Sequence, residues 1–125
     1  MKYLKSFFEN YSINKKFIIE ENKFKLFIDN NLVAETSYNI EESDEFFNEK
    51  YISIYDLETF EQFRGKGYAR LLLEEIFKYT KDKLKIKIIT LIVDKDNYKA
   101  VNLYLKTGFE IFIEYEYSYS LVKYL

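Results

Sequence analysis

The 125-residue sequence contains no cysteine, histidine or proline, and only three glycines. Without cysteine there is no disulfide, no thiolate nucleophile and no zinc–thiolate site. Without histidine, His-based catalytic triads, histidine metal sites and a histidine general base are all excluded. Any acid–base chemistry must therefore use Asp, Glu, Tyr or Lys side chains, a chain terminus or water, and we expect no metal cofactor.

The sequence also lacks a strong net charge and a long apolar run. A net charge of −2 gives no support for nucleic-acid binding. No apolar run reaches the roughly 20 residues that span a bilayer, and the N-terminus has no signal-peptide hydrophobic region. We therefore expect a cytoplasmic protein with no membrane partner. The hydrophobic content of 48% suffices for a core, and the length predicts one domain over residues 1–125.

Hydrophobic periodicity predicts an α/β fold. Helical spacing is clearest over 67–82, and Asn97 and Gly108 bracket a second helix over 97–107. A strand–helix–strand order in the middle of the chain implies a parallel crossover, so we predict a mixed sheet of six or seven strands. Residues 3–11 read as a short helix or an irregular arm. Strands are predicted over 17–19, 24–28, 32–40, 51–60, 86–93, 109–115 and 118–125, with a hairpin turn at 29–31.

All three glycines and both arginines lie in two short motifs. The first is Arg64-Gly65-Lys66-Gly67-Tyr68-Ala69-Arg70, which leads into the helix over 67–82, and the second ends at Gly108. Backbone amides that open a helix form a natural anion site, and glycine lets a ligand approach closely. The loop matches neither a P-loop nor a complete Rossmann fingerprint. A plain glycine-rich turn is the alternative.

Together the two motifs resemble the GNAT N-acetyltransferase superfamily. Residues 64–69 fit Q/R-x-x-G-x-G/A, and residues 97–109 resemble N-x-x-A-x-x-L-Y-x-x-x-G-F. The resemblance covers about residues 50–125. It implies a GNAT-like acyl-CoA N-acyltransferase fold with a central β-α-β-α-β unit, acetyl-CoA as co-substrate and a primary amine as acceptor. Members of the superfamily usually carry two helices between their first two strands. The stretch between Ile19 and Phe24 is too short for both, so we expect reduced helices or helices displaced to residues 2–11.

The resemblance also implies which residues bind acetyl-CoA. The amides of residues 65–70 would hold the pyrophosphate, and the pantetheine arm would run along residues 57–59, where a backbone amide could polarise the thioester carbonyl. Asn97 would lie beside the cofactor, although a plain helix cap explains it equally well. The complete predicted cofactor set is Leu57, Glu58, Thr59, Arg64, Gly65, Lys66, Gly67, Tyr68, Ala69, Arg70, Asn97, Ala100 and Tyr104.

Three residues are candidates for catalysis. Tyr104 matches the superfamily tyrosine that protonates the departing thiolate; the alternative is that it only packs. Asp56 and Glu58 are the first candidates for the base that accepts the amine proton, and strict strand alternation puts them on one face, with Leu57 and Thr59 on the other. Both acids could instead be solvent-facing. The acidic run over 41–45 lines an acceptor entrance or forms a solvated turn. Converging acids would favour a cationic acceptor such as lysine, a polyamine or another primary amine.

Two further expectations concern partners. The C-terminal aromatic residues predict a possible homodimer surface, although core burial explains at least half of them. Two rival functions are open: a catalytically silent domain that binds acyl-CoA, and an interaction domain in which the glycine loop is only a turn. The first predicts CoA binding without turnover, and the second predicts no CoA binding. The aromatic residues concerned are Phe112, Tyr115, Tyr117, Tyr119 and Tyr124.

Overall fold

Two-residue turns join the first three strands of the protein. The computed structural model describes residues 14–125; the arm predicted over 3–11 and the helices expected within 2–11 lie outside this range. Strands β1 (Lys15–Glu20) and β2 (Lys23–Ile28) are joined at residues 21–22, and β2 is joined to β3 (Asn31–Glu41) at residues 29–30. All four turn residues have positive φ, which matches the twist of paired strands. The two-residue β1–β2 turn confirms that the stretch between Ile19 and Phe24 is too short for both helices.

The rest of the chain completes one mixed sheet. Within residues 14–125, seven strands pair in the order β1-β2-β3-β4-β5-β7-β6, and only the β4–β5 pair is parallel. The chain after β3 forms β4 (Tyr51–Thr59), a 3₁₀ turn (Glu61–Phe63), α1 (Tyr68–Asp82), β5 (Ile88–Asp94), α2 (Tyr98–Lys106), β6 (Glu110–Glu114) and β7 (Ser118–Tyr124). The predicted strands and both predicted helices are confirmed to within two residues at most ends. None of the helices described is long and apolar enough to cross a membrane.

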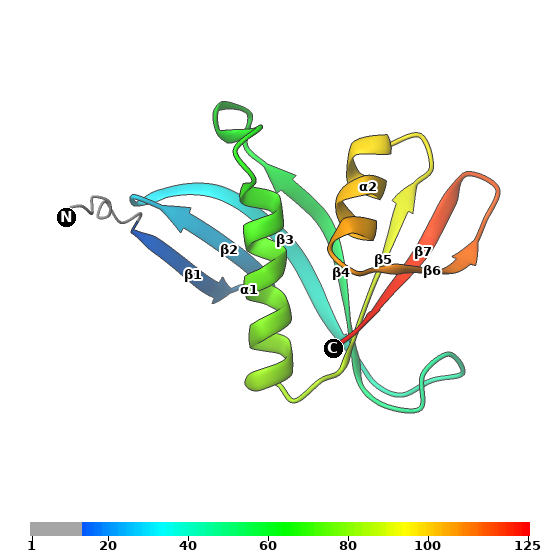
Figure 1. Cartoon of the computed structure of the whole chain (residues 1–125). Helices are drawn as coiled ribbons and strands as arrows, with labels where there is room; N and C mark the ends of the chain where they lie inside the picture. Colours follow the sequence, from blue (N-terminus) through cyan, green and yellow to red (C-terminus); the bar gives the residue numbers. More distant parts are fainter. Residues whose placement is uncertain (1–13) are drawn as a thin grey trace.

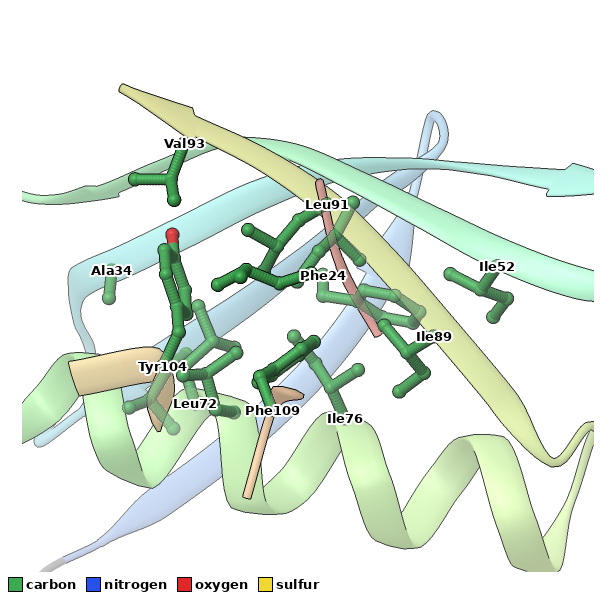
Figure 2. Close-up of a cluster of buried hydrophobic side chains, with 14 of the residues drawn as sticks. Phe24, Ala34, Ile52, Leu72, Ile76, Ile89, Leu91, Val93, Tyr104 and Phe109 are labelled. Carbon is green, nitrogen blue, oxygen red and sulfur yellow. The ribbon is translucent and has the colours of Figure 1, made fainter. Parts of the chain in front are cut away.

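The two helices cover the same face of the sheet, α1 over its first half and α2 over the second (Figure 1). Leu72, Leu73 and Ile76 on the apolar face of α1 are fully buried. They pack on core-facing strand residues such as Phe24, Ile52 and Ile89 (Figure 2). Burial of each such side chain contributes roughly 1.5–3 kcal/mol. This shared core fixes both helices against the sheet and thereby positions the loops that precede them.

The sheet opens between β4 and β5. Their pairing is limited to Ile52 with Ile89 and Ser53 with Thr90. Beyond these pairs the two strands diverge towards their C-terminal ends (Figure 1). The edge of β4 that faces β5 is therefore not paired with β5 over residues 54–59. An unpaired strand edge offers amides and carbonyls to an extended ligand, as the pantetheine prediction requires.

A β-bulge interrupts β4 at Asp56. Asp56 has a φ of 56°, and the register with β3 jumps from Ser37–Tyr55 to Glu35–Glu58, so two residues of β4 face Thr36 alone. The bulge breaks the in–out alternation between Tyr55 and Asp56, which are both exposed, whereas over residues 56–59 exposed and half-buried side chains still alternate. The extra residue re-aims the strand immediately before the segment where the cofactor was predicted to bind.

Candidate active site

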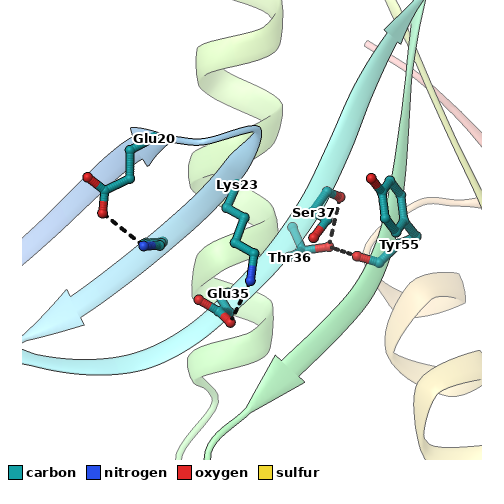
Figure 3. Close-up of polar contacts among 7 residues, drawn as sticks. Glu20, Lys23, Glu35, Thr36, Ser37 and Tyr55 are labelled. Atoms are coloured by element: carbon teal, nitrogen blue, oxygen red, sulfur yellow. Dashed lines mark hydrogen bonds and ion pairs between the residues drawn. The ribbon is translucent and has the colours of Figure 1, made fainter.

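Thr36 holds the bulge from the neighbouring strand. Its side chain is fully buried, and its hydroxyl donates a hydrogen bond to the carbonyl of Tyr55 at 2.8 Å, as Figure 3 shows. A buried hydrogen bond of this kind fixes the backbone where the ladder is irregular. Thr36 is not among the site residues predicted from the sequence. The available signal was a polar residue in the core-facing register of β3, between Ala34 and Tyr38.

The glycine loop starts α1 without a side-chain cap. Gly65 and Gly67 have φ values of 79° and 82°, and a Cβ at either position would meet no atom within 4 Å. Leu71 makes the first intrahelical hydrogen bond, to the carbonyl of Gly67 at 3.1 Å. The amides of residues 68–70 therefore precede the helical ladder and have no acceptor within it. They lie at the positive end of the helix dipole, with N–H groups that are free to donate within the helix's first turn.

The charged residues of the loop differ in position. The Nε of Arg64 donates to the carbonyl of Thr59 at 2.9 Å, which ties the loop to the end of β4. Arg70 forms an exposed i,i+4 pair with Glu74 at 3.4 Å, a contact that contributes little to stability. Both arginines line the cavity described next, whereas Lys66 is not among its lining residues.

One cavity of about 770 Å³ brings together the predicted cofactor residues. The end of β4, the glycine loop, the start of α1 and one side of α2 form its walls. Lys99 and Leu103 on α2 also line it, and neither was predicted. Of the predicted set, all residues except Lys66 line the cavity: Leu57, Glu58, Thr59, Arg64, Gly65, Gly67, Tyr68, Ala69, Arg70, Asn97, Ala100 and Tyr104.

Asn97 and Tyr104 reach this cavity from α2. Asn97 caps the helix, because its side chain accepts a hydrogen bond from the amide of Ala100 at 3.3 Å, and it lines the cavity as well. Tyr104 is only 7% exposed. Its ring packs edge-on against Phe109, and its hydroxyl points towards Val93 on β5 (Figure 2). Burial alone raises the pKa of Tyr104 to about 12, so the phenol is neutral at physiological pH.

A second, polar cavity of about 530 Å³ lies on β2, β3 and β4 and contains both candidate bases. Asp56 and Glu58 line it together with Ser37 and with the ion pair between Lys23 and Glu35, at 3.3 Å (Figure 3). Leu57 and Glu58 line both this cavity and the larger one. The two cavities therefore meet at the β4 bulge, and Asp56 and Glu58 line the polar cavity together.

Within the acidic run over 41–45, Asp44 makes specific hydrogen bonds. The carboxylate of Asp44 accepts hydrogen bonds from the amides of Phe46 and Phe47 at 2.9 and 3.1 Å, and from the hydroxyl of Tyr51 at 2.5 Å. The bond from Tyr51 lowers the pKa of Asp44 and, in return, raises the pKa of Tyr51 to about 12. Asp44 thus organises a turn that places two phenylalanines against the sheet. Among residues 14–125, no cluster of acidic side chains has the arrangement of a metal site.

Comparison with known proteins identifies the family. The model of the acetyltransferase (GNAT) family matches residues 3–109, so the chain belongs to this family. In sequence it is 41% identical over 49 residues to the acetyltransferase PseH of Campylobacter jejuni; that match covers 39% of this chain and 31% of PseH. The chain thus aligns with less than a third of the curated relative's length.

Solved structures show the same fold. PseH of Campylobacter jejuni in complex with acetyl coenzyme A superposes with a TM-score of 0.65 and 22% identity, over 98% of this chain and 75% of that one. The PaiA N-acetyltransferase of Thermoplasma acidophilum in complex with coenzyme A gives 0.67 and 19% identity, over 82% and 60%. The predicted GNAT fold, a mixed sheet with a central β-α-β-α-β unit, is confirmed.

Proposed function

We propose that the protein is an acetyl-CoA-dependent N-acetyltransferase that acts on a primary amine by direct attack within a ternary complex. The observation that carries the proposal is the cavity of about 770 Å³, where residues from three separate sequence segments meet beside Tyr104. Family membership supports acetyl transfer, and the structures of relatives with bound acetyl-CoA or CoA support the choice of co-substrate.

The described residues fit such a co-substrate. The amides of residues 68–70 and the side chain of Arg64 would hold the pyrophosphate, and the β5-facing edge of β4 would pair with the pantetheine arm. Acetyl-CoA supplies an activated thioester. An amide at the end of β4, near Leu57 or Thr59, would stabilise the oxyanion that develops when the amine attacks.

Two groups of the chain would handle the protons. The amine forms a C–N bond with the acetyl carbon as the C–S bond breaks. Its proton passes to the carboxylate of Asp56 or Glu58, directly or through water, and from there to solvent, while the sulfur leaves as a thiolate hydrogen-bonded by Tyr104 and takes up a proton from water. The products are an N-acetylamine and the thiol of CoA, so atoms and charge balance. No covalent enzyme intermediate is needed, in keeping with the absence of cysteine.

Tyr104 would act chiefly as a hydrogen-bond donor to the leaving sulfur. With a tyrosine pKa of about 12 and an ordinary thiol pKa of about 8.5, complete proton transfer costs roughly 5 kcal/mol. Desolvation in the same buried setting also raises the pKa of the thiol and reduces this difference. The neutral phenol is thus positioned to stabilise the departing thiolate throughout the physiological pH range.

Calorimetric titration with acetyl-CoA tests the co-substrate site. Gly67→Asp and Gly67→Asn form a matched pair, since both side chains tolerate positive φ and only one carries a charge. We expect wild type to bind, Gly67→Asn to bind more weakly, and Gly67→Asp to lose at least about ten-fold more affinity through repulsion of the pyrophosphate. Equal affinities for the two variants would show that no anion binds at the start of α1.

A catalytically silent acyl-CoA-binding domain is the second candidate. It is favoured by the tight β1–β2 turn, because the two helices usual at this point in the family are absent between these strands. This candidate predicts acetyl-CoA binding without amine-dependent release of thiol, and no effect of Tyr104→Phe.

The possible homodimer remains a prediction; Phe112, Tyr115, Tyr117 and Tyr124 are exposed.

A further inference from the structure

A third cavity lies on the face of the sheet that the helices leave open. Core-facing residues of β4 and β5, such as Ile54 and Leu91, point to the helices, whereas Ser53, Tyr55 and Ile92 alternate to the other side. There the strands, the loop over 42–50 and β6 enclose about 320 Å³. This aromatic cavity plays no part in the co-substrate site described above.

Fixed aromatic side chains form the walls of the aromatic cavity. Phe47 is 8% exposed, and its ring stacks on Phe112 at 5.2 Å and packs on Tyr51 at 4.9 Å. Phe46 meets Phe112 edge-on at 6.2 Å. The Asp44 turn holds both phenylalanines from the loop side. The buried Phe47 thus anchors a cluster of rings in mutual contact, whose outer members, Phe46 and Phe112, are exposed at the mouth of the cavity.

The chemistry of the lining selects its ligand. None of the residues that line the aromatic cavity is charged, and its polar groups are the hydroxyls of serine, threonine and tyrosine. Ser53 and Thr90 satisfy one another at 3.1 Å. A charged group would lose its hydration here without compensation, whereas a flat ring would stack on the aromatic walls. The volume suits one ring or a fused pair, not a whole nucleotide co-substrate.

The aromatic cavity adjoins the proposed acetyl-transfer site through consecutive residues of β4. Tyr55 lines it, the next residue, Asp56, lines the polar cavity, and Leu57 and Glu58 line both the polar and the co-substrate cavities. Two residues of a strand span about 7 Å. A ring held beside Tyr55 thus places an amine on a short side chain near the carboxylates and the gap between β4 and β5.

We infer that the acceptor is a primary amine attached by a short linker to a flat, uncharged ring, and that the ring binds in the aromatic cavity. This assignment rests on the proposed acetyltransferase function. The amine nitrogen bonds to the acetyl carbon as the C–S bond breaks, with its proton leaving to Asp56, Glu58 or water as described above. The carboxylates would bind the amine end of the acceptor, and the uncharged aromatic cavity would bind its ring.

Ligand-observed saturation-transfer NMR with 2-phenylethylamine, without acetyl-CoA, tests the cavity independently of catalysis. Ile92 lines the cavity and is 69% exposed, so the variant Ile92→Asn should fold. The control is Ile40→Asn, because Ile40 is 45% exposed on β3 and lies outside the cavity. We expect saturation of the ring protons in wild type and Ile40→Asn, and its loss in Ile92→Asn. No ring saturation in wild type, or equal saturation in both variants, would overturn the inference.

Thiol release from acetyl-CoA tests the acceptor assignment. We expect kcat/KM at least about ten-fold higher for 2-phenylethylamine than for 1,5-diaminopentane, with the preference reduced about five-fold in Ile92→Asn only. Acetyl-CoA binding with no preference for the ring-bearing amine would overturn the acceptor assignment alone. Failure of acetyl-CoA to bind in the calorimetric titration would instead remove the proposed function. A change of oligomeric state in Ile92→Asn would mean that a second copy of the chain covers the cavity, which would also overturn the inference.

Discussion

Two threonine-to-valine substitutions should change stability in opposite directions. Thr36 on β3 and Thr80 on α1 are both fully buried. The hydroxyl of Thr36 donates to the carbonyl of Tyr55 at 2.8 Å, whereas that of Thr80 finds no partner among residues 14–125. Valine keeps the branched shape of threonine, so neither change leaves a cavity, and only the fate of the hydroxyl differs.

The magnitudes follow from hydrogen-bond energetics. Thr36→Val removes a buried hydrogen bond and should lower the free energy of unfolding by about 1–2 kcal/mol. Thr80→Val removes a buried hydroxyl that pays a desolvation cost, and should raise the free energy of unfolding by about 1 kcal/mol. The free energies of unfolding of the two variants should thus differ by about 2–3 kcal/mol, although both carry the same Thr-to-Val change.

Urea denaturation of wild type and both variants measures the difference, provided that the slopes of the unfolding curves agree. Calorimetry adds a functional readout: Thr36→Val should also weaken acetyl-CoA binding, because the bulge sets the position of residues 57–59, whereas Thr80→Val should not. Shifts of the same sign in the two variants would refute the assignment of the two hydroxyls. Unchanged acetyl-CoA affinity in Thr36→Val would show that the bulge does not depend on this bond.

Three further predictions concern the tyrosines and Asp44. Tyr104→Phe should lower kcat by about 10²-fold or more and leave acetyl-CoA affinity nearly unchanged, as measured by thiol release and calorimetry; an unchanged kcat would exclude a role for the phenol in catalysis. In alkaline titration followed by phenolate absorbance, Tyr104 and Tyr51 should ionise last, near pH 12. Their pKa values are raised above the unfolded value of about 10, so their contribution to the stability of the fold is complete below about pH 10 and is lost as the pH rises towards 12. Ionisation of either tyrosine near pH 10 would contradict the environments described for them. Asp44 has a lowered pKa, so the stability that it confers is present above about pH 3.9 and is lost as the pH falls through its folded pKa. Near-UV circular dichroism should therefore show an acid-induced change in the environment of Phe46, Phe47 and Tyr51, and Asp44→Asn should abolish this change.

Much of the fold follows from local patterns in the sequence. The apolar spacing of α1 predicted a helix, and the nearly unbroken apolar run over 86–93 predicted the strand β5. Asp29 and Asn30 predicted a turn because Asp and Asn tolerate positive φ. The residues around the co-substrate cavity came from motif resemblance, and the structure brings nearly all of them together. Their roles in binding remain predictions.

The bulge and the aromatic cavity could not be predicted in the same way. Asp tolerates a positive φ better than most residues, but a single Asp within an apolar and aromatic strand pattern does not predict a bulge, and only the pairing with β3 shows the extra residue. The aromatic cavity depends on contacts between residues far apart in the chain, such as Phe47 with Phe112. Phe46 and Phe47 within an acidic connection were the available signal, but only the tertiary structure shows what they enclose.

The most direct test of acetyl transfer is to incubate the protein with acetyl-CoA and a panel of primary amines, and to measure free thiol and N-acetylated product together. The account predicts that thiol release requires both protein and amine, and that one N-acetylamine forms for each thiol released. Acetyl-CoA binding without amine-dependent release of thiol by any member of the panel would contradict the account.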